Sequence, residues 1–324
     1  MKLRIVFMGT PDFAVSTLDA LLALPEAQVV AVITGPDRPA GRGRQLQASA
    51  VKEAALAHGL PVLQPTNLKD AAFVAELKTY AADLQVVVAF RMLPEVVWNM
   101  PRLGSVNIHG SLLPQYRGAA PINWALMHGD QETGVSSFFL RHAIDTGDLI
   151  LQDKIAIAPD DDFGSLYDKL KVLGAALAAR TVAAIAAGAA PSTPQPATPN
   201  LRPAPKLTKE TGRLDFTRPA PELVNQVRGL APAPAAYTTL PDGRTLKIFK
   251  ARVLPNDDTL PPYFAVTPGA ATTDGRSYYR IQTDPENEGG LLDLLEVQLE
   301  GKKRMGIADL LRGTKLPATT EPLG

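Results

Sequence analysis

Two side chains that can act on one substrate atom stand close together in this sequence, Asn107 and His109. The largely apolar stretch 103–108 predicts a short strand, and alternate residues of a strand point to the same face. An amide and a protonated imidazole can together hold an oxygen that becomes negatively charged, and the imidazole can also move a proton near neutral pH. The pair therefore predicts acyl-transfer chemistry. In isolation, an Asn and a His at this spacing are more often a turn former and a structural histidine.

Further motifs accompany the pair in a fixed order. The run Asn-x-His-x-Ser-Leu-Leu-Pro at 107–114, Arg-Gly at 117–118 and Asp-Thr-Gly-Asp at 145–148 resemble the folate-dependent formyltransferase family. Gly-Thr-Pro-Asp-Phe-Ala at 9–14, Pro-Asp-Arg-Pro-Ala-Gly-Arg-Gly at 36–43, Gly-Ala-Ala-Pro-Ile at 118–122 and Leu-Tyr-Asp-Lys-Leu at 166–170 are similar to the members that act on methionyl-tRNA. The resemblance covers nearly the whole chain.

The resemblance implies a reaction and a catalytic set. A formyl group would pass from 10-formyltetrahydrofolate to the α-amino group of methionyl initiator tRNA, with Asn107, His109 and Asp145 as catalytic residues. Attack of the amine on the formyl carbon builds negative charge on the formyl oxygen, which the Asn107 amide and the His109 cation would stabilise. Asp145 would favour that cation and help to relay the amine proton. Outside the family pattern, Asp-Thr-Gly-Asp is ordinary turn chemistry.

The resemblance also implies a folate site. A loop that ends in proline, with main-chain groups beside apolar side chains, suits a flat pterin. Relatives usually have an aromatic residue and a glycine ahead of the Leu-Pro pair, whereas this chain has Arg91 and no glycine there. The expected folate-binding residues are Ser111, Leu112, Leu113 and Pro114, together with main-chain groups of Phe90, Met92 and Leu93.

Basic residues in two regions are the candidates for tRNA contacts. Residues 35–47 form a long Gly- and Pro-rich loop with three arginines, which suit phosphates and bases, although a solvated loop would have the same composition. The resemblance favours the first interpretation, because this loop enters the tRNA acceptor end in the family. C-terminal lysines would either follow an RNA backbone or keep sheet edges soluble. The expected contacts are Arg38, Arg42, Arg44, Lys206, Lys302 and Lys303.

Strands and helices alternate in the first half of the chain. Buried strands are expected at 3–8, 29–33 and 84–90, with helices at 13–24, 50–57 and 68–80 between them. This alternation predicts an α/β fold with a doubly wound, mostly parallel Rossmann-like sheet, whose ligands lie beyond the carboxyl ends of the strands. The first turn lacks G-x-G-x-x-G, so a dinucleotide cofactor is not supported.

The second half begins with a helix expected at 163–187. Three aspartates at 160–162 would cap this helix; the weaker alternative is that they bind a metal ion. We expect a formyltransferase catalytic domain at 1–188, a Pro-rich linker at 189–207 and a tRNA-binding domain at 208–324. Short strands expected at 214–216, 235–240, 246–254, 278–283 and 291–299 predict a small, mostly-β barrel of the OB-like kind.

Composition limits the possible functions. The chain has 324 residues and a formal net charge of zero, so a broadly basic nucleic-acid binder is excluded. It has no cysteine and four scattered histidines, so we expect no disulfide and no metal. No apolar run approaches the roughly 20 residues of a membrane span. The sequence predicts a soluble, cytoplasmic monomer with no membrane partner.

Two other functions share these residues. A formyltransferase that acts on a sugar nucleotide, on glycinamide ribonucleotide or on another small amine would keep Asn107, His109 and Asp145; the arginine-rich loop favours tRNA instead. A non-catalytic RNA-binding relative would have no reason to retain that set.

Overall fold

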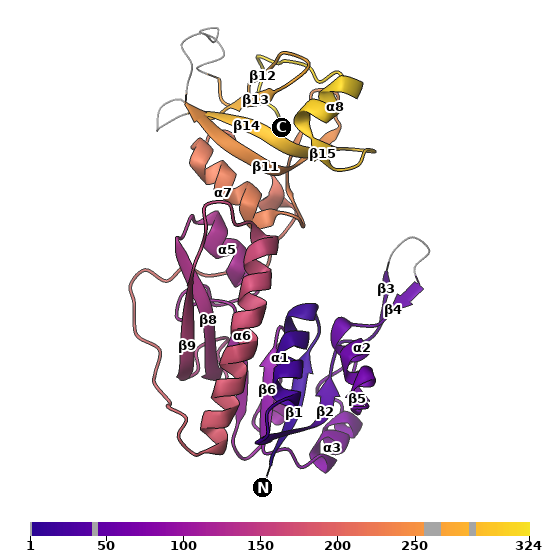
Figure 1. Ribbon diagram of the computed structural model, residues 1–324, viewed down its shortest axis with the longest axis vertical. Helices are drawn as coiled ribbons and strands as arrows, with labels where there is room; N and C mark the ends of the chain where they lie inside the picture. The colour runs from indigo at the N-terminus through magenta and orange to yellow at the C-terminus, as the bar shows by residue number, and fades with distance from the viewer. Residues whose placement is uncertain (1, 41–44, 256–266, 285–289) are drawn as a thin grey trace. The chain divides into compact units, whose positions relative to one another are not determined.

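The computed structural model describes residues 2–40, 45–255, 267–284 and 290–324. Its contacts divide the chain into two compact units (Figure 1). The first comprises Met1–Pro121, Glu132–Ala156 and Tyr167–Ala204, and the second comprises Ile122–Gln131, Ile157–Leu166 and Pro205–Gly324. Two short segments from the middle of the chain thus belong with the C-terminal part. The domain boundaries expected at residues 188 and 208 stay a prediction.

A seven-stranded sheet forms the centre of the first unit. Its strands are β1 (Leu3–Gly9), β2 (Ala27–Ile33), β5 (Val62–Leu63), β6 (Leu84–Val88), β7 (Ser105–His109), β8 (Glu132–Phe139) and β9 (Leu149–Ala156). Their order is β5-β2-β1-β6-β7-β8-β9. The first five run parallel, β8 is antiparallel to β7, and β9 is antiparallel to β8. The predicted doubly wound, mostly parallel sheet is confirmed.

Helices cover both faces of this sheet (Figure 1). They are α1 (Asp12–Leu22), α2 (Ala50–Ala57), α3 (Ala71–Thr79), α4 (Glu95–Trp98) and α6 (Phe163–Ala186). Val6, Met8 and Val87 on one face pack with apolar residues of α3 and α4. On the other face, Gly174 of α6 lies against Ile108 and Phe13. Burial on both sides explains why β1 and β6 are apolar apart from Arg4 and Gln85 near their amino ends.

The arginine-rich loop contains a hairpin that the sequence did not predict. Strands β3 (Arg38–Ala40) and β4 (Gln45–Gln47) pair antiparallel. No sequence pattern indicated these strands, because main-chain hydrogen bonds join them and their residues show no apolar alternation. At the base of the hairpin, Asp37 accepts hydrogen bonds from Lys52 at 2.7 Å and Gln64 at 2.8 Å. Two predicted contacts, Arg42 and Arg44, lie outside the described residues.

The second unit contains an antiparallel sheet in the order β10-β11-β14-β13-β12, with β15 paired to β14. The elements are η1 (Glu210–Gly212), α7 (Ala220–Leu230), β10 (Ala236–Thr239), β11 (Thr245–Pro255), β12 (Ala271–Thr273), β13 (Tyr279–Gln282), β14 (Gly290–Leu299), β15 (Met305–Gly306) and α8 (Ile307–Gly313). Helix α5 (Pro121–Met127) adds Met127 to its apolar core. The predicted strand-rich C-terminal domain is confirmed.

The C-terminal segment joins the two outer strands of that sheet. Thr319 exchanges two main-chain hydrogen bonds of 2.9 Å with Ala271 of β12. Gly324 exchanges hydrogen bonds with Thr239 of β10 at 2.5 and 3.2 Å. The C-terminal segment therefore bridges β12 and β10, the two edge strands of the sheet, as closure of the predicted barrel requires.

Residues 214–216, which the sequence predicted as a strand, form no strand in the structure. The Asp215 side chain accepts hydrogen bonds from the main chain and hydroxyl of Thr217 at 3.1 and 2.7 Å. This local turn competes with strand pairing. Leu214 and Phe216 are nevertheless buried in the core of the unit, so the apolar pattern was informative about burial and wrong about the element.

The Pro-rich segment 189–204 packs along the first unit. Thr193 pairs with Leu149, and Ala204 pairs with Gly118. A Cβ atom at Gly118 would lie 2.4 Å from the Ala204 carbonyl oxygen, and its φ is +128°, so only glycine permits this approach. The segment is therefore extended, as its prolines predict, but it is held against the sheet domain.

The aspartates before α6 act as a helix cap. Asp162 Oδ1 accepts a hydrogen bond of 2.9 Å from the Ser165 main chain, and Ser165 Oγ accepts one of 3.1 Å from the Asp162 main chain. This reciprocal pair is a capping box. The predicted capping is confirmed, and Asp162 is the residue that provides it.

Replacement of Asp162 should therefore lower stability. Asp162→Ala removes the acceptor for a main-chain N–H of the first turn and should lower the free energy of unfolding by about 1 kcal/mol. Asp160 is exposed and has no side-chain partner within the described residues, so Asp160→Ala should stay within about 0.5 kcal/mol of wild type. Thermal unfolding followed by circular dichroism measures both. Equal losses in the two variants would contradict the assignment.

Candidate active site

Strand register places Asn107 and His109 on one face of the sheet. Asn107 is the neighbour of Val87 on β6, and Val87 packs toward α3 and α4. Ile108 points the other way, toward α6. Asn107 and His109 therefore project on the same face, at the carboxyl end of the last parallel strand. The predicted convergence of these two side chains agrees with the register.

The Asn107 amide makes no hydrogen bond with the part of the chain that the structure describes. Its side chain is half-buried, so neighbouring residues limit the movement of the amide although none of those described is hydrogen-bonded to it. Asn123 behaves differently, since its amide donates a 2.7 Å hydrogen bond to the Gly229 carbonyl. Buried polar groups normally find partners within the protein. An unengaged amide beside a histidine is therefore available to a ligand.

His109 is almost fully buried, with 7% of its surface exposed. Its Nε2 atom lies 2.8 Å from the carbonyl oxygen of Tyr116. A carbonyl only accepts hydrogen bonds, so Nε2 carries a proton and donates it. The other ring nitrogen, Nδ1, lies 3.9 Å from Asp145 Oδ2. Nδ1 is thus the nitrogen that can serve a substrate atom.

Asp145 reaches His109 by a path that the sequence does not reveal. Since β8 is antiparallel to β7, it ends at Phe139 beside Val106, which lies toward the amino end of β7. Residues 140–148 then turn back across the face that carries His109. Asp145 has a φ of +53°, a left-handed conformation that Asp tolerates better than most residues. Its Oδ2 atom accepts a 2.9 Å hydrogen bond from the main chain of Gly118.

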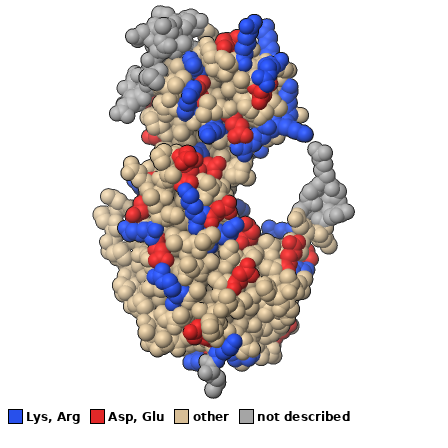
Figure 2. All heavy atoms as spheres, viewed as in Figure 1, with Lys and Arg blue, Asp and Glu red and all other residues tan. Residues whose placement is uncertain are grey.

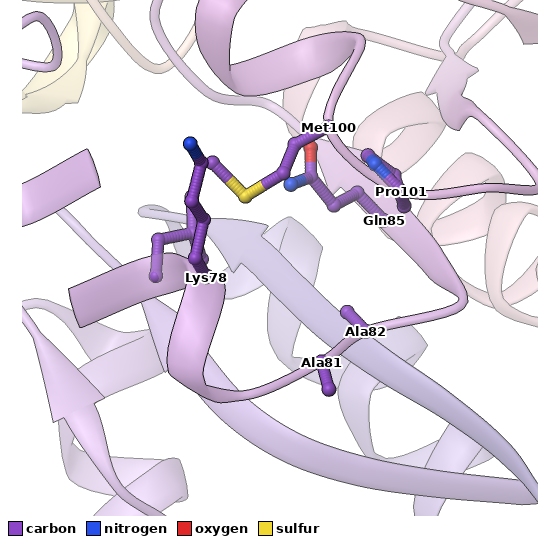
Figure 3. A pocket seen from close by; sticks show the side chains of 7 residues that line it. Lys78, Ala81, Ala82, Gln85, Met100 and Pro101 are labelled. Carbon is purple, nitrogen blue, oxygen red and sulfur yellow. The ribbon is translucent and has the colours of Figure 1, made fainter. Parts of the chain in front are cut away.

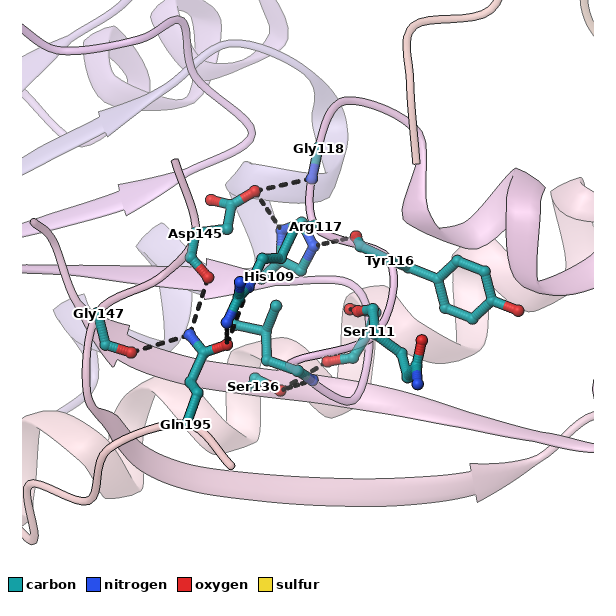
Figure 4. Close-up of polar contacts among 11 residues, drawn as sticks. His109, Ser111, Tyr116, Arg117, Gly118, Ser136, Asp145, Gly147 and Gln195 are labelled. Atoms are coloured by element: carbon teal, nitrogen blue, oxygen red, sulfur yellow. Dashed lines mark hydrogen bonds and ion pairs between the residues drawn. The ribbon is translucent and has the colours of Figure 1, made fainter. Parts of the chain in front are cut away.

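A glutamine from the Pro-rich segment completes the network around Asp145 (Figure 4). Gln195 Nε2 donates to the carbonyl oxygens of Asp145 and Gly147 at 2.8 and 2.9 Å. Gln195 Oε1 accepts from Nε and Nη2 of Arg117 at 3.1 and 2.6 Å. Gln195 lies in the stretch predicted to be a linker, where no role was expected for it, because a lone glutamine among prolines belongs to no pattern.

The expected folate-binding loop is supported from β8. Ser136 Oγ, which is fully buried, donates to the Ser111 carbonyl at 2.6 Å and accepts from the Leu113 main chain at 3.0 Å. Gln152 donates to the Leu113 carbonyl at 2.9 Å. Ser111 and Leu113 are themselves buried, whereas Leu112 and Pro114 are partly exposed. Several main-chain groups of the loop that we expected to face a ligand therefore bind neighbouring side chains instead.

The second expected folate segment follows β6. Phe90 packs partly into the core, Leu93 is buried, and Met92 is 73% exposed. Main-chain groups of Met92 and Leu93 make no hydrogen bond within the described ranges, so they are open to a ligand. Arg91, at the position where we expected a glycine from the resemblance, donates to the carbonyls of Pro65 and Thr66.

The first turn of the sheet domain is fixed by a tyrosine from α6. Phe13, in the first turn of α1, donates its main-chain N–H to Tyr167 Oη at 3.0 Å, and that hydroxyl donates to Asp12 Oδ1 at 2.6 Å. Burial, and then the hydrogen bond to Asp12, raise the pKa of Tyr167. Its hydroxyl therefore keeps its proton and its role as a donor.

The predicted tRNA contacts that the structure describes are dispersed. Arg38 is exposed at the start of the β3–β4 hairpin. Lys206, Lys302 and Lys303 are exposed in the second unit. Lys and Arg side chains spread over the visible face of that unit, with Asp and Glu between them (Figure 2). The charges alone do not define a single RNA track.

A cavity of about 240 Å³ lies elsewhere in the first unit, lined by residues that include Leu77, Gln85 and Met100 (Figure 3). It adjoins the amino end of β6, away from the residues described above. Among the described residues, no group of three or more His, Asp or Glu side chains could hold a metal ion. No helix in the described ranges is long and apolar enough to span a membrane.

Known proteins resemble this chain over most of its length. Residues 1–182 match the family described as Formyl transferase, and residues 206–315 match Formyl transferase, C-terminal domain. A methionyl-tRNA formyltransferase from Bacteroides fragilis is 51% identical over 321 residues, covering 97% of this chain and 96% of the relative. That of Flavobacterium johnsoniae is 47% identical over 315 residues, covering 96% of each.

The solved structures that resemble this chain are more distant in sequence. A sugar 3N-formyl transferase, solved in the presence of dTDP and 5-N-formyl-THF, matches with a TM-score of 0.65 at 16% identity, covering 94% of this chain and 100% of that one. An N-formyltransferase from Helicobacter canadensis has the same TM-score of 0.65 at 17% identity, covering 90% of this chain and 99% of that one. At this identity the likeness concerns the fold alone.

The support of the loop by Ser136 can be tested through stability. Ser136→Ala leaves the buried N–H of Leu113 and the carbonyl of Ser111 without this partner, which should cost about 1–3 kcal/mol. Ser16 in α1 makes no hydrogen bond through its hydroxyl within the described part, so Ser16→Ala should change stability by less than about 0.5 kcal/mol. Urea unfolding followed by Trp98 fluorescence in a Trp124→Phe background measures both. A neutral Ser136→Ala would contradict the proposed support.

Proposed function

The chain belongs to the methionyl-tRNA formyltransferase family, and we propose that Asn107, His109 and Asp145 carry its transfer of a formyl group from 10-formyltetrahydrofolate to the α-amino group of methionyl initiator tRNA. In this reaction the amine nitrogen bonds to the formyl carbon, the bond from that carbon to N10 breaks, and a proton passes from the amine to N10. The enzyme has to hold the formyl oxygen while it is negatively charged and has to provide a path for the proton.

Asn107 and His109 hold that oxygen. The Asn107 amide, which has no hydrogen-bond partner among the residues that the structure describes, is the observation that carries the proposal, because a donor that is already positioned costs no reorganisation when charge develops. The His109 ring is oriented by the hydrogen bond from Nε2 to Tyr116. In the cationic ring, the Nδ1–H group is then the only donor left for the substrate.

Asp145 has two tasks. Its carboxylate, 3.9 Å from His109 Nδ1, stabilises the positive charge of the imidazolium. It also accepts the amine proton through a water molecule or the ring and returns it toward the leaving nitrogen. The hydrogen bond from Gly118 leaves the second carboxylate oxygen for this exchange. No covalent intermediate on the protein is needed.

The folate is bound by two loops, residues 90–94 and 111–114, which lie beside the catalytic triad of Asn107, His109 and Asp145. Main-chain groups of Met92 and Leu93 provide hydrogen bonds for the edge of the pterin. Leu112 and Pro114, which are partly exposed, provide apolar contact for its face. Ser111, Leu113 and Phe90 hold these loops in shape from within the core. The folate site is therefore made mostly of main chain and apolar surface.

The tRNA is bound by the arginine-rich segment 35–47 and by lysines of the C-terminal unit. Arg38 and the further arginines at 42 and 44 bind the acceptor end, for which guanidinium groups provide paired donors to phosphate. Lys206, Lys302 and Lys303 contribute salt-sensitive contacts to the backbone. The family membership favours this substrate over the small amines of the structurally similar sugar enzymes, which share the fold at 16–17% identity.

Loss of either oxyanion donor should reduce turnover strongly. Asn107→Ala and His109→Ala should each lower kcat by about 10²–10³-fold, because each removes a donor that acts on the charged oxygen. Formyl transfer to methionyl initiator tRNA at saturating substrates measures the effect.

Asn99→Ala is a control for the loss of an asparagine amide elsewhere in the domain, because Asn99 lies at the C-terminal end of the short helix α4. Its kcat should remain within about 3-fold of wild type. Near-normal turnover in both Asn107→Ala and His109→Ala would remove the proposed oxyanion site.

The two basic regions should respond differently to mutation. Arg42→Ala should lower kcat/KM for the tRNA by about 10-fold or more, since it removes a charge-assisted contact near the reacting end. Lys302→Ala and Lys303→Ala should each reduce the slope of log affinity against log salt by about 1, with a smaller effect on turnover. Filter binding over a salt series measures the slopes, with exposed Lys69→Ala as control. Larger losses from the lysines than from Arg42 would contradict this division.

A further inference from the structure

Gln195 joins two parts of the active site through one side chain. Its amide nitrogen contacts the carbonyls of Asp145 and Gly147, and its amide oxygen contacts the Arg117 guanidinium. Carbonyls only accept and a guanidinium only donates, so the orientation of the amide is fixed by its partners. Glutamate would lack the donors and lysine would lack the acceptor. Within this arrangement the four hydrogen bonds require a glutamine.

The turn that Gln195 contacts needs support from outside. Asp145 has a positive φ of +53°, and it belongs to a loop of residues 140–148 without regular structure. Gly147 is packed so closely that an added Cβ would lie 1.6 Å from the Phe139 carbonyl oxygen. Within the loop, Thr146 Oγ1 donates to the Ala143 carbonyl at 2.9 Å. Hydrogen bonds to the two carbonyls on either side of Thr146 fix the direction in which Asp145 points.

The segment that carries Gln195 is itself well anchored. Pro194 and Pro196 flank it and restrict its backbone, so little conformational entropy is lost when the amide binds. Two residues earlier, Thr193 exchanges main-chain hydrogen bonds with Leu149 at 2.8 and 3.0 Å. The side chain is therefore presented from a stiff support.

The same segment also holds the loop on the other side of His109. The Tyr116 main chain donates to the Arg202 carbonyl at 2.7 Å, Ala204 donates to the Arg117 carbonyl at 2.9 Å, and Ala119 donates to the Ala204 carbonyl at 2.7 Å. Tyr116 orients His109, and Gly118 binds Asp145. Residues 193–204 thus hold, through hydrogen bonds, the loops that orient both His109 and Asp145.

We propose that Gln195 is a positioning residue for formyl transfer, which sets the direction of the Asp145 carboxylate toward His109 by holding its turn against Arg117. The proposal rests on the proposed function, because it concerns the turn that carries Asp145. Gln195 acts on the chemical step through Asp145 and contacts neither substrate.

Two variants separate this role from simple packing. Gln195→Glu keeps the shape and the acceptor for Arg117 but turns an oxygen toward two carbonyls. Gln195→Met keeps the length and loses all four hydrogen bonds. Each should lower kcat by about 10–100-fold, the size of effect that a displaced catalytic group produces. KM for the folate and for the tRNA should change by less than about 3-fold, because binding surfaces are untouched.

Ser192→Ala is the matched control. Ser192 lies in the same segment and donates to Asp148 at 2.9 Å. Its replacement by alanine removes one hydrogen bond between residues 189–204 and the 140–148 loop and leaves the hydrogen bonds to the Asp145 and Gly147 carbonyls in place. Its kcat should stay within about 2-fold of wild type. If Ser192→Ala loses as much activity as the Gln195 variants, loosening of the segment explains the effect and the proposal is overturned.

A double-mutant cycle tests the route through Asp145. In an Asp145→Ala background, Gln195→Glu should cost less than about 3-fold, because the group that it positions is gone. An equal loss with and without Asp145, or near-normal kcat in both single Gln195 variants, overturns the proposal while leaving the catalytic triad intact. Normal turnover in Asp145→Ala alone overturns instead the role proposed for Asp145, and the positioning role with it. Circular dichroism of each variant confirms that it is folded.

Discussion

A carboxylate has to be held beside a buried histidine by a loop that has no strand or helix of its own, and the rest of the sheet domain is arranged around that constraint. The histidine is easy to place, because it ends the last parallel strand of the sheet. Asp145 is difficult to place, because the neighbouring strand runs in the opposite direction and its loop must cross back over the sheet. The main chain of Gly118 and the side chain of Gln195 supply the missing support.

The ring of His109 is constrained in the same way. Its Nε2 proton is donated to Tyr116, in a loop that is itself paired with residues 202–204. One ring nitrogen is therefore used for orientation, and the other faces Asp145. This division is common where a histidine works near a carboxylate, since the tautomer is set by the hydrogen bond that the non-reacting nitrogen makes. Asn107 needs no such partner because the strand itself fixes its direction.

The sequence was sufficient to predict the sheet and the placement of Asn107 and His109 on one of its faces, and it was insufficient for what surrounds them. Largely apolar runs identified β1 and β6 because both faces of those strands are buried. The alternation along residues 105–109 placed Asn107 and His109 together because a strand repeats every two residues. The crossing of the 140–148 loop depends on the register between β7 and β8, which no local pattern reveals. Gln195 was missed because hydrogen bonds to main-chain carbonyls leave no signature in composition.

Residues 189–204 change how the chain can be divided. By composition they are a spacer between two domains, yet they complete the walls around Asp145 and His109. An exchange of the C-terminal barrel between relatives would therefore have to leave this stretch with its own N-terminal partner. The C-terminal barrel can therefore change without disturbing this region, whereas the peptide that leads to it has to remain matched to the loops that carry Tyr116 and Asp145.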